Sequence, residues 1–281
     1  MQMQPKGFFS QLWVLLRRYY DHGVGLQGAA IAYYLLFSIF PLLIFLSTFL
    51  GMLDLDPEPV LASLHNVVPQ GVLEIVEQYL EYVTVNANST LMSFALVFTV
   101  YFPLRTSLAL VRGIGRAYGG VQEERFWVLT LRVLLYTLLL TLSIAVTLVT
   151  MLTSGRVLSW IDRWFPLSPV LFRLWPVGRF VLLALVLLLA LLFLYGLTLP
   201  GHRGHWRCVL PGAVAALAAW LLASAGYSAY VEHFGRYTVL YGSIGAVMVT
   251  LIWLWLSAVI ILMGAELNGL QREKKERKNV I

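Results

Sequence analysis

The fold is decided near the C-terminus by residues 241–270, which read YGSIGAVMVTLIWLWLSAVIILMGAELNGL. A run of 22 residues in this stretch, 243–264, carries no charge. As a helix with a rise of about 1.5 Å per residue, that run is roughly 33 Å long, enough to cross a bilayer core of about 30 Å. Glu266 and Asn268 follow directly after it. The stretch therefore predicts a transmembrane helix that ends in a carboxylate at the edge of hydrocarbon, where a charge needs a partner.

The whole composition agrees with a membrane protein. Hydrophobic residues make up 59% of the 281 residues and charged residues 12%, too few polar groups to cover a soluble domain of this size. The single cysteine, Cys208, excludes an internal disulfide and leaves too few thiolates for a typical structural zinc site. The first residues do not follow the pattern of a removable signal peptide, so we expect none.

Apolar segments along the chain predict an all-α, polytopic membrane protein with six transmembrane helices, treated as one domain over residues 1–281. The predicted spans are residues 28–50, 91–111, 133–152, 180–199, 208–230 and 243–267. Residues 1–27 contain an amphipathic helix that either lies on the membrane surface or packs on the bundle. Residues 51–88 predict an extracytoplasmic, amphipathic helical cap, and residues 268–281 a basic cytoplasmic tail.

The charges set the predicted orientation. Residues 51–88 hold six acidic and no basic residues, which is typical of an outer segment. These acids form either a solvated face or a vestibule that attracts cations. With both termini in the cytoplasm, 14 of the 20 basic residues lie inside, five outside, and Arg105 lies within the membrane. The positive-inside rule thus accounts for the net charge of +6, and we expect no nucleic-acid partner.

Arg105 is the most unusual residue of the predicted spans. It follows Pro103 in an otherwise apolar segment, where an arginine costs about 2.5 to 3.5 kcal/mol at mid-membrane. Arg105 lies in the inner half of its span, and Glu266 lies at the inner end of the last span. A contact between them is therefore one expectation. The sequence leaves three interpretations of Arg105 open. It has a transport or gating role, it forms a purely structural pair, or its side chain extends toward the membrane surface.

Other polar or helix-breaking residues join these two in a predicted transport pathway or gate. Pro41 breaks a backbone hydrogen bond in the first span and predicts a kink, for a functional or a purely structural reason. Glycines at the entry of the last span permit helix movement. The complete predicted pathway consists of Tyr33, Tyr34, Ser38, Pro41, Arg105, Tyr241, Gly242, Gly245, Glu266 and Asn268. Small residues in the fifth span, at Gly212, Ala216, Ala219, Ala223, Ser224 and Ser228, predict close helix packing.

No motif in the sequence predicts an enzyme. The best metal-ligand cluster, His202, His205 and Cys208, lies beside glycines and a proline that disfavour a regular helix. His233 beside Glu232 lacks an accompanying nucleophile motif, and no glycine-rich phosphate loop is present. We expect no catalytic, cofactor-binding or metal site, and no cofactor.

Three stretches carry a resemblance to a known family. They are AAIAYYLLFSIFPLL, LVRGIGRAYG and the long block from WRCVLPGAVAALAAW to LMGAELN. Together they resemble the YihY/BrkB family of bacterial inner-membrane proteins over nearly the whole chain. The resemblance implies a six-helix protein of the bacterial cytoplasmic membrane, with associations from envelope lipid transport to solute export. A ribonuclease label attached to some members has no support in these residues.

These patterns predict a transporter or translocator of lipid or of a small anionic or amphipathic solute. Arg105 would recognise the anionic group, and Glu266 would balance or gate it. The expected partners are membrane lipids and an anionic lipid or solute as cargo. The alternative is a scaffold that organises envelope machinery without transport, and an intramembrane enzyme ranks third.

Overall fold

A computed structural model describes residues 8–52, 89–120, 126–152, 169–198, 206–234 and 243–279, and in these ranges every regular element is a helix and none is a strand. In chain order the helices are α1 (Phe8–Asp21), α2 (Val24–Met52), α5 (Ser89–Ala117), α6 (Phe126–Leu152), α8 (Pro169–Thr198), α9 (Trp206–Phe234) and α11 (Ser243–Asn279). The all-α prediction is confirmed for these residues.

Four helices are long and apolar enough to cross a membrane. Their candidate spans are Ser93–Ala117, Gly178–Thr198, Cys208–Val231 and Ile244–Lys275, within α5, α8, α9 and α11. The other two predicted spans fall in α2 and α6, where shorter apolar stretches were found, Val24–Ile39 and Trp127–Ser143. A polytopic membrane protein is thus supported, while six spans and their topology stay predictions. The predicted outer cap lies outside the described residues, except for the end of α2.

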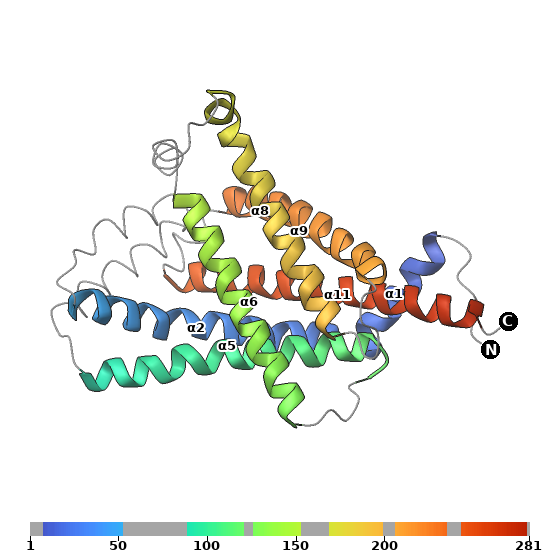
Figure 1. Cartoon of the computed structure of the whole chain (residues 1–281), viewed down its shortest axis with the longest axis horizontal. Coiled ribbons are helices and arrows are strands. Elements are labelled where there is room, and N and C mark those ends of the chain that lie inside the picture. The colour runs from blue at the N-terminus through green and yellow to red at the C-terminus, as the bar shows by residue number, and fades with distance from the viewer. Residues whose placement is uncertain are drawn as a thin grey trace.

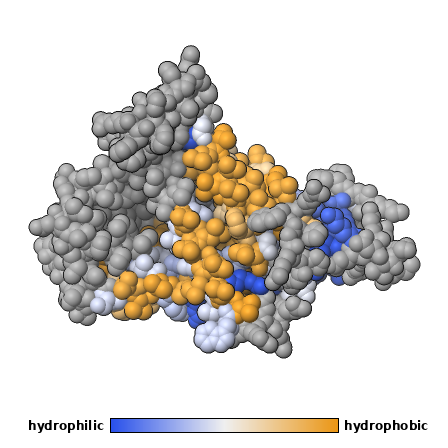
Figure 2. Space-filling view, viewed as in Figure 1, coloured by the Kyte–Doolittle hydropathy of each residue, from blue (hydrophilic) through white to orange (hydrophobic). Residues whose placement is uncertain are grey.

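The helices form one packed bundle (Figure 1). Helix α2 packs between α5 and α11, and α9 packs on α11. Helix α8 contacts α9, and α6 contacts both α8 and α5. Many large apolar side chains stay exposed, among them Leu222, Val181 and Leu138 at 76%, 64% and 66%. In Figure 2 such hydrophobic residues cover the middle of the bundle, whereas hydrophilic residues gather at one end. This distribution suits a surface that faces lipid.

Glycines set the closest helix contacts. A Cβ atom on Gly212 of α9 would lie 2.2 Å from the carbonyl oxygen of Gly264 in α11, and one on Gly269 would lie 2.0 Å from the carbonyl oxygen of Ala117 in α5. Ala216 is also buried, which confirms close packing for the first part of the small-residue pattern. Further along α9, Ala223 and Ser224 are half-buried while Ala219 and Ser228 are exposed, so the small residues are buried most completely in the first part of the pattern.

Helix α1 and the C-terminal part of α11 lie at the same end of the bundle, called here the α1 end (Figure 1). The chain leaves α1 through His22 and Gly23, whose φ of 62° is in the left-handed region that glycine adopts readily. Residues 1–27, predicted as one segment, therefore contain the break between α1 and α2. The predicted basic tail begins inside α11, which continues as a helix to Asn279.

Candidate functional site

The α1 end is built around a buried carboxylate. Glu266 is 1% exposed. One carboxylate oxygen lies 2.5 Å from Nδ1 of His22, and the other accepts a hydrogen bond of 3.4 Å from Nη1 of Arg18. Arg18 also donates through Nη2 to Glu273, at 2.6 Å. Two carboxylates of α11 therefore share one arginine of α1, and the network fastens α1 to the bundle.

The expected pair between Arg105 and Glu266 does not form. Glu266 is bound by Arg18 and His22, while Arg105 donates from Nε to the hydroxyl of Tyr101, at 3.0 Å. The reason is axial register. Gly269 in α11 lies against Ala117 in α5, and Arg105 lies roughly 18 Å up α5 from Ala117 at about 1.5 Å per residue. The two charges belong to different levels of the bundle.

Asn268 is also buried, and its amide binds the backbone of α9. Its Oδ1 accepts from the backbone N–H of Gly212 at 2.7 Å, and its Nδ2 donates to the carbonyl of Val209 at 3.0 Å. A longer contact of 3.5 Å joins Nδ2 to the hydroxyl of Tyr118. Burial raises the pKa of the Tyr118 phenol well above its ordinary value, so this hydroxyl stays protonated at neutral pH. Asn268 is thus a packing residue of the α9–α11 contact.

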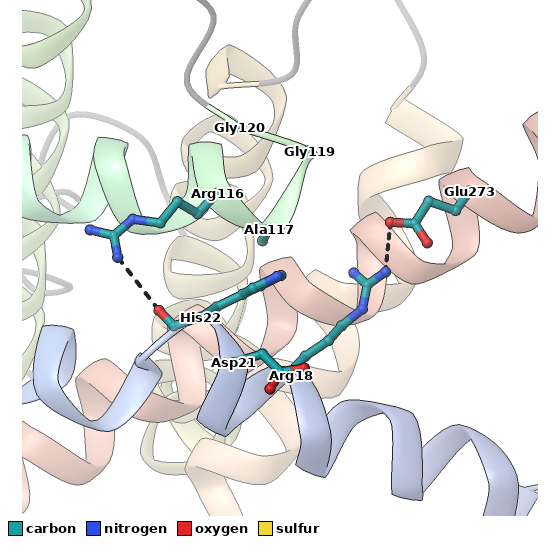
Figure 3. Close-up of a pocket in the computed structure, with 8 residues that line it drawn as sticks. All are labelled: Arg18, Asp21, His22, Arg116, Ala117, Gly119, Gly120 and Glu273. Carbon is teal, nitrogen blue, oxygen red and sulfur yellow. Dashed lines mark hydrogen bonds and ion pairs between the residues drawn. The ribbon is translucent and has the colours of Figure 1, made fainter. Parts of the chain in front are cut away.

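A pocket of about 380 Å³ opens beside this network (Figure 3). Its lining residues come from the end of α1, the end of α5 and the C-terminal part of α11; they are Arg18, Asp21, His22, Arg116, Ala117, Gly119, Gly120 and Glu273. Arg116 donates to the carbonyl oxygen of His22 at 3.5 Å. Gly119 and Gly120, with φ of 102° and 114°, carry the chain away from α5.

Arg105 lies on a different surface, in the middle of the candidate span Ser93–Ala117. Its side chain is exposed, and its guanidinium carbon lies 5.3 Å from the ring centre of Tyr101. Tyr34 of α2 lies in the vicinity of this side chain. Among the described residues, no carboxylate forms an ion pair with Arg105.

Further aromatic rings of α2 and α5 pack together around Phe102, about one helical turn from this arginine. Tyr33 packs on Phe37 with ring centres 4.5 Å apart, and Phe37 contacts Phe102 at 6.0 Å. Tyr33, Phe37 and Tyr101 are 49%, 41% and 41% exposed. We call the surface formed by Tyr33, Tyr34, Phe37, Tyr101, Phe102 and Arg105 the arginine-aromatic face.

The remaining predicted pathway residues are dispersed. Ser38 donates to the carbonyl of Leu35 within α2, at 2.6 Å, and Pro41 lies within the same continuous helix. Gly245 is buried in the first turn of α11. Tyr241 and Gly242 lie outside the described residues. The structure therefore brings Tyr34 near Arg105 and places Glu266 and Asn268 at the α1 end, and it does not gather the predicted pathway into one site.

Sequence reasoning did not find the partners of Glu266. The amphipathic pattern within residues 1–27 places Arg18 on the polar side of its helix, and it indicates no partner for His22. A signal was available, because a carboxylate at the inner edge of a span requires a cation, and Arg18 belongs to a segment predicted on the same side. For metal chemistry, no group of three His, Cys, Asp or Glu side chains suited to a metal ion occurs in the part of the chain that the structure describes.

Comparison with known proteins gives matches over almost the full length. The virulence factor BrkB family matches residues 15–280. A ribonuclease-like protein of Bacillus subtilis (strain 168), YfkH, is 30% identical over 262 residues, which are 93% of this chain and 95% of YfkH. A UPF0761 membrane protein of Tolumonas auensis is 26% identical, covering 95% of this chain and 86% of its own length. A UPF0761 membrane protein of Coxiella burnetii (strain Dugway 5J108-111) is 25% identical, covering 91% of this chain and 90% of its own length. No solved structure matches.

Proposed function

The chain belongs to the virulence factor BrkB family, and we propose that it translocates a lipid or a small anionic or amphipathic solute across the bacterial cytoplasmic membrane. In this proposal both termini face the cytoplasm, and the α1 end is the cytoplasmic end. Phospholipid is the cargo that we favour, because it presents a phosphate to an arginine and acyl chains to apolar rings.

One observation supports the proposal above the others: Arg105 is exposed midway along a candidate span. A cation facing hydrocarbon at that depth costs about 2.5 to 3.5 kcal/mol. The Tyr101 hydroxyl is a neutral acceptor and does not compensate a full charge. An anionic group that passes along α5 would supply that compensation through a charge-assisted hydrogen bond.

The rest of the arginine-aromatic face fits an amphipathic cargo. Half-exposed rings of Tyr33, Phe37 and Tyr101 offer apolar area for a chain, and their hydroxyls, where present, offer hydrogen bonds. Pro103, two residues before Arg105, lacks a backbone N–H, so α5 loses one helical hydrogen bond at this level. Local loosening of α5 would let the arginine side chain follow a passing headgroup.

A route along this face also agrees with the packing elsewhere. The backbones of α9 and α11 meet at Gly212 and Gly264 with no room for a Cβ atom, so a solute cannot pass between these helices at that level without separating them. The same tight contact favours the second candidate function, a scaffold that organises envelope machinery and moves nothing.

Reconstitution of the full chain distinguishes a transporter from a scaffold. Purified protein is placed in liposomes with a trace of tail-labelled fluorescent phosphatidylglycerol, and the loss of fluorescence on adding dithionite measures movement between leaflets. We expect Arg105→Gln to slow this movement by about tenfold or more, since hydrogen bonds to charged groups contribute about 1.5 to 3 kcal/mol. Arg105→Lys should keep part of the rate, because it keeps the charge.

The matched control is Arg112→Gln, which removes an exposed arginine from the same helix nearer the α1 end and should leave the rate unchanged. Equal rates of lipid movement for wild type and Arg105→Gln would contradict the proposed role of Arg105 in binding the anionic group. If folded wild type moved neither the labelled lipid nor a trapped anionic dye, transport itself would be rejected in favour of the scaffold.

A further inference from the structure

The pocket at the α1 end holds charges of both signs, carried by different helices. Arg116 comes from α5, Asp21 from the end of α1 and Glu273 from α11. Figure 3 shows Arg116 and Glu273 on opposite sides of the view, with Asp21 below them. A ligand inside this pocket therefore meets a cation in one direction and carboxylates in others.

Arg116 has several N–H donors without an acceptor among the described residues. Its side chain is exposed, and with the described residues it makes one hydrogen bond, a long one of 3.5 Å from Nη1 to the carbonyl of His22. A guanidinium carries five N–H donors in a planar fork, the arrangement that binds phosphate oxygens in pairs. Arg18, by contrast, is 13% exposed and is already held by Glu266 and Glu273. The phosphate-binding group of the pocket is therefore Arg116.

The two carboxylates remain accessible although each has a partner. Asp21 is 58% exposed beside Arg17, and Glu273 is 48% exposed beside Arg18. Each carboxylate has about four lone-pair positions, so an arginine contact on one side leaves acceptors for another donor. An ammonium group, with compact charge and several N–H donors, suits this position.

The sum of the charges favours a zwitterion over a simple anion. Two arginines and two carboxylates line the pocket, which makes it neutral when His22 is neutral. A ligand with net negative charge would bring its own charge against Asp21 and Glu273. A ligand with a phosphate and an ammonium group keeps the total neutral and satisfies both signs.

Helix α1 also carries an apolar surface, on the side that is turned away from the pocket. Four of its large side chains are exposed in a helical stripe: Leu12 at 47%, Trp13 at 71%, Leu16 at 47% and Tyr20 at 73%. Spacings of three and four residues put them on one side of the helix. Arg18 and Asp21 lie on the opposite side of α1, so the strip suits contact with the membrane and would hold the pocket at the membrane surface, where lipid headgroups lie.

From these observations we infer that the pocket binds the headgroup of a zwitterionic phospholipid, with the phosphate on Arg116 and a primary ammonium group on Asp21 and Glu273. This inference names a cargo class and so rests on the proposed function. Headgroup binding to the pocket can nevertheless be measured without transport. The inference and the proposed function can therefore fail independently. Free phosphoethanolamine shares the headgroup chemistry without the chains.

The test is calorimetric titration of the full chain in detergent micelles. The probes are dihexanoyl phosphatidylethanolamine, dihexanoyl phosphatidylglycerol and phosphoethanolamine. We expect phosphatidylethanolamine to bind tightest and phosphoethanolamine at least about tenfold more weakly, since burial of each CH₂ contributes about 0.8 kcal/mol. Arg116→Gln should weaken phosphatidylethanolamine binding about tenfold or more. Arg112→Gln, one turn earlier on α5 and outside the pocket lining, should leave it unchanged.

The carboxylates provide the sharper test. Asp21→Asn and Glu273→Gln should each weaken phosphatidylethanolamine while leaving phosphatidylglycerol unchanged or tighter, because only the first lipid carries an ammonium group. Both variants preserve the contacts of Glu266, and their folding is checked by thermal unfolding.

Tighter phosphatidylglycerol binding by wild type, or no effect of Arg116→Gln, would overturn the inference. Equal affinity for phosphoethanolamine would overturn the lipid assignment. Binding without lipid movement in liposomes would reject the transport function and leave this site intact.

Discussion

At the scale of single residues, Glu266 is the most constrained charge in the described structure. A carboxylate that is 1% exposed loses most of its hydration, and such a charge is tolerated only when partners replace the water. Arg18 and His22 do so from α1 and the turn after it. The backbone carbonyl of His22 also accepts from Nε2 of Gln27 at 2.7 Å, which helps to fix the turn that presents the ring.

Removing this carboxylate should therefore be costly. We predict that Glu266→Ala lowers the free energy of unfolding by about 3 kcal/mol, because it leaves Arg18 and His22 without their buried partner. Glu273→Ala is the matched control: it removes a carboxylate that is 48% exposed and binds the same arginine, so its cost should stay below about 1 kcal/mol. Denaturation in identical micelles, followed by tryptophan fluorescence, measures both. Equal destabilisation would show that burial of Glu266 contributes nothing special.

At the scale of elements, hydropathy predicted the helices well and their contacts poorly. The charge-free run before Glu266 is a helix, but α11 also continues through the lysine- and glutamate-rich tail, because those residues are good helix formers. Arg18 and Glu266 are 248 residues apart. Periodicity within one helix shows which side is apolar, not which distant helix meets it. The expected Arg105–Glu266 pair failed for that reason, since the axial register of α5 against α11 is set by contacts such as Gly269 on Ala117.

The α9–α11 contact offers a test at this scale. We predict that Gly212→Ala destabilises the protein by several kcal/mol, because the new Cβ atom would lie 2.2 Å from the Gly264 carbonyl and 2.5 Å from the Asn268 side chain. Gly226→Ala, in the same helix, meets nothing within 4 Å and should be neutral or stabilising by up to about 1 kcal/mol. Thermal unfolding in one detergent compares the two. Similar behaviour would mean that α9 and α11 do not approach this closely.

At the scale of the whole molecule, two surfaces along α5 combine into one proposed route. The pocket at the α1 end joins three helix ends, and the arginine-aromatic face lies on α5 and α2 at mid-span. Each surface presents an exposed arginine of α5, Arg116 in the pocket and Arg105 at mid-span. A phospholipid that enters at the pocket would meet the second arginine after moving along α5, so α5 is the element on which both proposals depend.

The contact between α1 and α11 also bears on how often the chain crosses the membrane. Because Arg18 lies 2.6 Å from Glu273, α1 and the C-terminal part of α11 share one side, and a chain with both ends on one side crosses an even number of times. The proposed topology adds α2 and α6 to the four apolar spans, which makes six crossings, an even number. By the positive-inside rule, the proposal assigns the shared side to the cytoplasm.

Cysteine labelling tests this orientation, and the chain is well suited to it because Cys208 is its only cysteine. In a Cys208→Ser background, we predict that Lys274→Cys, on α11, reacts with a membrane-impermeant maleimide only after the cells are lysed. Asp56→Cys, in the acidic segment that the sequence places outside, should react in intact cells whose outer membrane has been permeabilised. Labelling of both cysteines in intact cells would place Asp56 and Lys274 on the same outer side. That result would contradict the five crossings that the six-span topology predicts between them. The reverse pattern would invert the topology and place the pocket, with its lipid headgroup, on the outer leaflet.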